Sequence, residues 1–347
     1  MASVDRTIKR PGQIDEVSFW DRTKRARSAY LYLLPAIIIM SIITFTPILY
    51  QFYMSFTDFG ARSLNPSPTN KAYLEPEWIG LENYRKIVTN EVGAKLPNFN
   101  FFRTLGFNLW WTFSNVIFHV SIGVVVAVIL NIEGLRFKRL YRAIYILPMV
   151  LPQLVIATVW KNMFDGEYGA INQALKLGGG LFGIAPETFN IRWLQQIPDP
   201  IPGVPLPLSY FAMLITNIWL GWPFMTLVAT GALQSIPKEL YEAAEIDGAT
   251  PLQQFWKITL PLLRPAMVPA TILGIITTFN LFHIIYFISE GGPLGRTEIL
   301  VTQAYKLING NQLYGLGAAF SVFMFVILGL LSAATARVSR VAEAYDD

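Results

Sequence analysis

Neutral polar side chains inside long apolar stretches are the groups in this sequence that could recognise a ligand. They are Gln153, Asn217, Asn280 and His283, and the aromatic residue Phe279 adjoins the last two. Amide and imidazole groups hydrogen-bond to hydroxyls, and aromatic faces suit C–H surfaces, so this set fits an uncharged polyol such as a sugar. The alternative is that these side chains bond across packed helices, at about 0.6 kcal/mol each on average.

The depth of the three amides in their apolar stretches favours a shared ligand site. Asn217 lies about 8 residues, or ~12 Å at 1.5 Å per residue, from the start of its stretch. Asn280 lies at a similar depth from the end of its own stretch, and Gln153 lies near the middle of a third. If successive helices alternate in direction, these amides reach one layer. His283 follows Asn280 by three positions, so we expect both on one helical face.

Several kinds of chemistry are excluded or disfavoured by what the chain lacks. It has no cysteine and two histidines, so we expect no disulfide and no metal site. One of them, His119, is expected to hydrogen-bond between helices. There is no G-x-x-x-x-G-K-[ST] loop for a nucleotide and no titratable cluster, so we expect no catalytic residue and no cofactor. Ion coupling is disfavoured because the apolar stretches carry no charge, although unwound backbone can bind Na⁺.

The apolar stretches themselves are long enough to cross a membrane. Hydrophobic residues make up 53% of the chain and charged residues 14%, against about 25% charged in soluble domains. A transmembrane helix needs about 20 apolar residues. Six stretches without Asp, Glu, Lys or Arg qualify: Tyr30–Phe56, Leu105–Leu130, Ala143–Trp160, Ser209–Leu233, Ala266–Ser289 and Tyr314–Ala336. We therefore expect an all-α integral membrane protein with six transmembrane helices.

Basic residues set the expected orientation, because Lys and Arg concentrate on the cytoplasmic side of a membrane. They precede the first stretch, fill the short loop after the second and follow the sixth, so both termini are expected in the cytoplasm. The expected organisation is a basic tail at 1–29, a first helix at 30–56, an outer loop at 57–104, a five-helix core at 105–337 and a tail at 338–347.

A cytoplasmic loop at 234–265, inside that core, predicts two short helices with a stop between them. Gly248 is a natural helix terminator. Thr250 and Gln253 then form a capping-box pattern, and we expect the second helix to end at Pro261. A plain connection between spans, or an amphipathic helix in the interface, would also explain the caps. Neither explains as well why roughly 30 residues replace a short turn.

The same loop resembles the EAA loop of permease subunits of bacterial ABC importers. The matching residues are Glu242, Ala243, Ala244, Asp247, Gly248 and Ala249, followed by Ile258–Pro261. The resemblance implies that this loop is a coupling helix that docks on a partner ATPase. Three further segments resemble sugar permeases: Trp78–Tyr84, Phe137–Pro148 with Gly169–Asn172, and Gly291–Pro293. The implied fold is that of a type I importer permease, without the two extra N-terminal spans and large outer domain of the larger maltose-type members.

The maltose-type resemblance also implies a sugar site. The positions that match it are Met149, Gln153, Asn217, Leu220, Gly221, Phe224, Phe279, Asn280 and His283. Met149, Gln153 and His283 stand where a tyrosine, a serine and an asparagine are familiar. The implied substrate is maltose, a malto-oligosaccharide or a related sugar. The alternatives are another neutral solute, a glycoside or glycerol-phosphate-like solute, or an ion-coupled carrier.

The implied partners follow from the same family. They are a second permease subunit, an ATPase dimer that carries ATP and Mg on the cytoplasmic side, an extracytoplasmic sugar-binding protein and membrane lipid, with no nucleic acid. The implied location is the bacterial cytoplasmic membrane, with many passes. In this interpretation the chain moves sugar by alternating access while the partner hydrolyses ATP.

Overall fold

The computed structural model describes residues 27–66, 72–197 and 199–344. It divides into two compact units, Met1–Tyr53 and Met54–Asp347, which are considered separately. Most of the predicted basic tail at 1–29 and the end of the predicted tail at 338–347 lie outside the described residues.

The described residues of the first unit form one continuous helical segment that carries the first predicted span. α2 (Arg27–Met40) runs through a π-helical stretch, η1 (Ser41–Phe45), into α3 (Thr46–Met54). The hydroxyl of Thr46 donates to the carbonyl of Ser41 at 2.8 Å across the π-helical turn. Residues Leu31–Met54 are long and apolar enough to cross a membrane, which agrees with the predicted span at 30–56.

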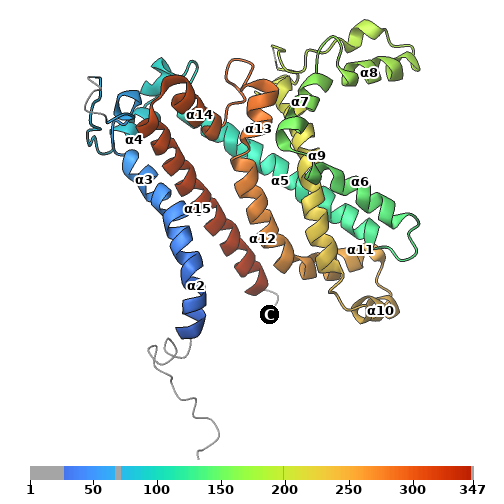
Figure 1. Cartoon of the computed structure of the whole chain (residues 1–347). Helices are drawn as coiled ribbons and strands as arrows, with labels where there is room; N and C mark the ends of the chain where they lie inside the picture. Colours follow the sequence, from blue (N-terminus) through green and yellow to red (C-terminus); the bar gives the residue numbers. More distant parts are fainter. Residues whose placement is uncertain (1–26, 67–71, 198, 345–347) are drawn as a thin grey trace, which may run out of the picture. The chain divides into compact units, whose positions relative to one another are not determined.

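The second unit is organised around four long helices (Figure 1). They are α5 (Phe101–Asn131), α9 (Leu208–Leu233), α12 (Leu260–Phe279) and α15 (Tyr314–Ala344). α5 and α9 pack along each other most extensively, and α12 contacts α5, α9 and α15. A small residue permits this close approach: a Cβ on Gly123 would lie 2.5 Å from the Cβ of Met225.

The third predicted span, Ala143–Trp160, is strongly bent rather than straight. α6 (Lys138–Val150) and α7 (Gln153–Met163) meet at an angle of 98°. The backbone is extended at Leu151, with ψ 138°, and at Pro152, with ψ 131°. Proline lacks an N–H and disfavours the helical region for the residue before it, which explains the break. The described residues therefore offer five candidate spans, or six if this bent pair is one span.

The fifth predicted span begins earlier than expected and is interrupted near its end. α11 (Pro251–Gln254) continues through η5 (Phe255–Thr259) into α12, and α13 (Phe282–Ile284) with η6 (Ile285–Ser289) follows after a break. The prediction that the second loop helix ends at Pro261 is therefore wrong. Pro261 instead lies at the second position of α12, directly after the π-helical stretch η5, so its missing N–H falls at the junction of two helical segments.

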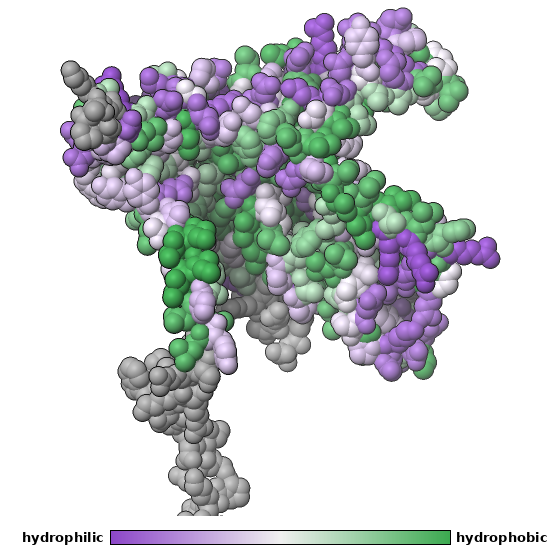
Figure 2. Space-filling model, in the orientation of Figure 1, coloured by the Kyte–Doolittle hydropathy of each residue, from purple (hydrophilic) through white to green (hydrophobic). Residues whose placement is uncertain are grey.

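Shorter elements lie at the ends of the long helices. They are η2 (Ala61–Ser63), α4 (Glu82–Val88), η3 (Glu91–Ala94), α8 (Ala170–Gly180), η4 (Pro186–Phe189), α10 (Glu239–Ile246) and α14 (Leu300–Asn311). Hydrophilic residues gather over the end with α8 and α14 and over the end with α10, with hydrophobic residues between (Figure 2). Two polar ends and an apolar middle are what a membrane-spanning core requires.

Candidate functional site

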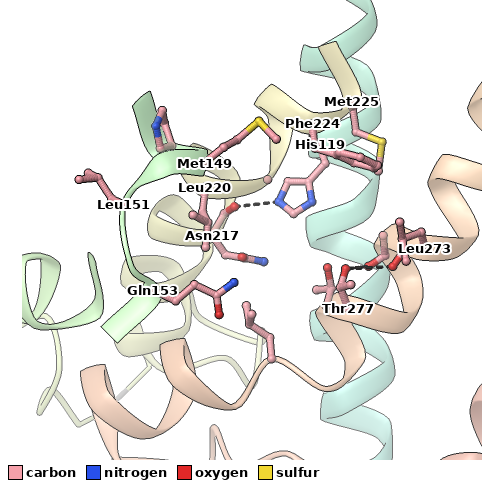
Figure 3. Close-up of a pocket in the computed structure, with 15 residues that line it drawn as sticks. His119, Met149, Leu151, Gln153, Asn217, Leu220, Phe224, Met225, Leu273 and Thr277 are labelled. Carbon is pink, nitrogen blue, oxygen red and sulfur yellow. Dashed lines mark hydrogen bonds between the residues drawn. The ribbon is translucent and has the colours of Figure 1, made fainter. Parts of the chain in front are cut away.

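A pocket of about 300 Å³ opens between α5, α6, α7, α9 and α12. Its aliphatic, aromatic and thioether lining is interrupted by a few polar side chains, and no charged residue lines it. The polar side chains that line the pocket come from four helices, and Figure 3 shows His119, Gln153, Asn217 and Thr277 among them. The full set is His119, Gln153, Asn217, Thr277 and Thr278.

Six of the nine predicted sugar-site residues line this one pocket. They are Met149, Gln153, Asn217, Leu220, Gly221 and Phe224. Four of the six lie on α9. The bend between α6 and α7 brings the other two, Met149 and Gln153, to the same cavity. The bend between α6 and α7 is therefore part of how the pocket forms.

The other three predicted residues do not line the pocket. Phe279 is fully buried in a core cluster with Phe320. Asn280 ends α12, where its side chain donates to the carbonyl of Ile276 at 3.2 Å. His283 is exposed and stacks on Phe287, with ring centroids 6.2 Å apart.

The prediction that Asn280 and His283 share one helical face is wrong. The helix stops between them: Asn280 has ψ 19°, Leu281 has ψ 77°, and a new short helix starts at Phe282. Asn108 of α5 fixes this break, because its Nδ2 donates to the carbonyl of Phe279 at 3.1 Å and its Oδ1 accepts from the Leu300 N–H at 3.0 Å.

A stripe of polar residues runs along one face of α5, and the sequence analysis missed most of it. Asn108, Thr112, Asn115 and His119 are all buried and are spaced by four, three and four positions. That spacing is the repeat of a single helical face, and it is the signal that could have found the stripe. We call these four residues the α5 polar stripe.

Two residues of the α5 polar stripe, Asn115 and His119, hydrogen-bond to Asn217 of α9. The side-chain Nδ2 of Asn217 donates to Asn115 Oδ1 at 2.8 Å. His119 Nε2 lies 2.8 Å from the main-chain carbonyl oxygen of Asn217. The prediction that His119 hydrogen-bonds between helices is confirmed, and the ring also lines the pocket. Gly221 makes room for it, because a Cβ there would lie 2.2 Å from His119 Cε1.

The loop at 234–265, which contains α10, forms one polar end of the core. Glu239 and Glu242 lie in the first turn of α10, and Gly248 follows the helix with φ 77°, a conformation that favours glycine. The capping box of Thr250 and Gln253 is present as predicted. The six predicted coupling residues are exposed or half-exposed: Glu242, Ala243, Ala244, Asp247, Gly248 and Ala249.

A cleft of about 440 Å³ lies beside α10. Lys238, just before α10, pairs with Glu133, which follows α5. This contact lowers the pKa of the Glu133 carboxyl and raises that of the Lys238 ammonium. Tyr241 of α10 adds a hydroxyl contact of 3.0 Å to Thr259. Side-chain contacts therefore connect the loop to α5 and to the helix that leads into α12.

A family model described as the inner membrane component of binding-protein-dependent transport systems matches residues 120–340. The chain belongs to this family. The match covers α6, α7, α9, α12 and the loop at 234–265, and it confirms the all-α membrane fold that the sequence predicts.

Curated relatives are similar to this protein over most of the chain. The galactooligosaccharides transport system permease protein GanP of Bacillus subtilis is 34% identical over 300 residues, 85% of this chain and 66% of that protein. The maltose/maltodextrin transport system permease protein MalF of Salmonella typhimurium is 32% identical over 76% of this chain and 49% of that protein. The chain therefore spans about half to two thirds of the length of these relatives.

A shorter relative and a solved structure cover the permease more evenly. The trehalose/maltose transport system permease protein MalF of Thermococcus litoralis is 32% identical over 88% of this chain and 91% of that protein. A chain from the crystal structure of a bacterial ABC transporter involved in alginate import has a TM-score of 0.70 at 20% identity, over 92% of this chain and 98% of that chain. This second likeness concerns the fold.

Proposed function

We propose that this permease translocates a neutral sugar, such as maltose, a malto-oligosaccharide or a related di- or oligosaccharide. The observation that carries the proposal is the uncharged pocket between the spans, which combines amide, imidazole and hydroxyl groups with the aromatic face of Phe224. Such a lining matches a molecule with many hydroxyls and apolar C–H faces. The printed names of the relatives, which concern galactooligosaccharides, trehalose and maltose, support the same class.

The uncharged lining also separates this proposal from its alternatives. A phosphorylated solute or an acidic polysaccharide would bury charge beside no Lys or Arg among the pocket residues, which costs several kcal/mol per ion. An ion-coupled carrier usually relies on charged groups inside the membrane. A neutral sugar needs neither a counter-ion nor a titrating group.

The proposed partners follow from the exposed loop at α10. Its apolar residue Ile246 is 87% exposed, and the residues around it face outward. In the proposal this loop docks on an ATPase dimer that holds ATP and Mg, while a second permease completes the pathway and an extracytoplasmic binding protein delivers the sugar. No nucleic acid takes part. Both termini are proposed to be cytoplasmic.

Uptake by the purified native complex in proteoliposomes tests the proposal. Maltose, trehalose, a galactooligosaccharide and a sugar phosphate would be compared in the wild type and in Asn217→Ala. Loss of a hydrogen bond in a buried site costs about 1–3 kcal/mol, so Asn217→Ala should lower sugar uptake about tenfold.

Thr158→Ala is the matched control, because the Thr158 hydroxyl bonds within α7 at 2.9 Å and does not line the pocket. Sugar uptake per assembled complex that is normal in Asn217→Ala would assign Asn217 to helix packing. A wild type that moves the sugar phosphate and none of the neutral sugars would overturn the proposed substrate.

A further inference from the structure

The orientation of the Asn217 amide is fixed by a chain of hydrogen bonds that begins on α5. Asn115 Nδ2 lies 2.6 Å from the Trp111 carbonyl oxygen, which can only accept. The Asn115 amide is therefore oriented with its NH₂ group toward Trp111 and its Oδ1 toward α9. The Asn217 group that meets this Oδ1 at 2.8 Å must be its NH₂. Asn217 Oδ1 consequently remains an acceptor with no hydrogen bond to a described residue.

The tautomer of His119 is fixed by the same reasoning. His119 Nε2 lies 2.8 Å from the main-chain carbonyl oxygen of Asn217, so Nε2 carries the hydrogen. In the neutral ring, Nδ1 then has a lone pair and no hydrogen. No described residue donates a hydrogen bond to Nδ1, and the ring lines the pocket (Figure 3). Gly221 lies against the ring.

A third group on α12 has the same polarity. The Thr277 hydroxyl donates its hydrogen to the Leu273 carbonyl at 2.9 Å, so its oxygen offers lone pairs to a ligand. Gln153 on α7 differs, because its amide makes no hydrogen bond to a described residue and can turn to donate or accept. His119 Nδ1, Asn217 Oδ1 and the Thr277 hydroxyl oxygen therefore share one hydrogen-bond polarity, whereas Gln153 of α7 and the Thr278 hydroxyl of α12 can donate or accept.

We infer that Asn115 and His119, two members of the α5 polar stripe, make this side of the pocket a wall of hydrogen-bond acceptors, with Asn115 as a positioning residue and His119 as both a positioning residue and a ligand of the sugar. The wall then recognises hydroxyl groups that donate and discriminates against groups of similar size that cannot. This inference rests on the proposed function, because it assigns the specificity of the same sugar site.

Uptake of singly fluorinated sugars by the native complex tests the wall. Fluorine resembles a hydroxyl in size and cannot donate. The parent is whichever of maltose, trehalose or a galactooligosaccharide the wild type transports fastest, and its hydroxyls are replaced one at a time. In the wild type, at least one fluorinated sugar should be taken up about tenfold more slowly than the parent, since the wall acceptor is left unpaired.

Asn115→Ala should lower the ratio of parent uptake to fluorinated-sugar uptake, because the freed Asn217 amide can turn and donate to fluorine. Uptake of the parent should fall while the ratio of parent to fluorinated sugar drops several-fold. Thr112→Val is the matched control, since Thr112 is buried on the same helix and bonds only to the Asn108 carbonyl among described residues, at 2.7 Å. It should leave the ratio unchanged.

His119→Gln keeps the test informative if Asn115→Ala does not assemble. Glutamine can place an NH₂ near the position of Nε2 and keep the contact with Asn217, but it has no group in place of Nδ1. The ratio should narrow at a hydroxyl that faces His119. A wild-type complex that transports fluorinated sugars as fast as the parent overturns the inference, as does an unchanged ratio in either variant. A wild type that transports no neutral sugar overturns the proposed function instead.

Discussion

The pocket wall and the loop at α10 use polar residues in opposite ways. In the wall, uncharged groups such as Asn115, His119 and Asn217 are 0–4% exposed and bond to one another across α5 and α9. At the loop, the charged residue Lys238 pairs with Glu133, which follows α5, and both side chains are exposed. The contrast follows from the surroundings, because a buried polar group without a partner costs free energy, whereas an exposed charge is already solvated.

This difference indicates which kinds of substitution should most affect the function of each region. Each wall residue has a hydrogen-bond partner and little room to move. Small changes of side-chain shape in the wall should therefore have large effects on uptake. Loop residues act through the backbone shape that presents them, so loss of one charge should matter less than loss of the turn. The following predictions rank these effects from the largest to the smallest.

The largest effect is expected from Gly248→Trp in the loop. Gly248 has φ 77°, and a bulky residue there would strain the turn and cover the surface proposed to dock on the ATPase. Central interface residues contribute about 2 kcal/mol or more, so sugar uptake and stimulated ATPase activity should fall about thirtyfold or more in proteoliposomes. Gly248→Asn is the control, because asparagine tolerates this conformation better than other residues. Normal coupling in Gly248→Trp would show that the loop only connects α9 and α12.

A smaller loss is expected from Gly221→Ala in the wall. The added methyl group would lie 2.2 Å from His119 Cε1, so the ring must leave its contact with Asn217. Overpacking of this kind costs about 1–3 kcal/mol, which should lower the yield of assembled complex and the uptake per complex about tenfold. The double variant Gly221→Ala/His119→Ala relieves the clash and should recover the yield without recovering uptake. Full recovery of uptake in the double variant would mean that His119 only fills space.

The sequence predicted the wall and the loop to different extents, for physical reasons. The caps at Thr250 and Gln253 and the turn at Gly248 are local, so composition and spacing alone were sufficient. Pro148 and Pro152 indicate that helix hydrogen bonding can be interrupted in the third span. The size of the bend, 98°, was not predictable, because prolines occur in both kinked and broken membrane helices and neighbouring helices decide which.

The candidate site shows the same limit over longer distances. Asn280 was assigned to a helical face that the break after α12 removes, and this break depends on Asn108, 172 residues earlier in the chain. The spacing of the α5 polar stripe was present in the sequence and could have been found. What the spacing could not give was the partner of each group, which depends on how α5 packs against α9 and α12.

The smallest effect is expected from Glu133→Gln, which removes the ion pair with Lys238. The pKa of Glu133 lies below its ordinary value of 4.5 and that of Lys238 above its ordinary value of 10.5. The pair therefore contributes fully between those two values. Its contribution is lost as pH falls below 4.5 through the Glu133 pKa, or rises above 10.5 through that of Lys238. At pH 7 both partners are charged, but an exposed pair is weak and screened by salt, so uptake should change by less than about twofold.

Thermal unfolding of the purified complex between pH 6 and pH 4 would isolate this pair, because the wild type should lose slightly more stability over that range than Glu133→Gln. A large fall in uptake in Glu133→Gln at pH 7 would mean that the exposed charges matter as much as the buried wall. In that case the loop, like the pocket, would depend on individual side-chain contacts as well as on the shape of its backbone.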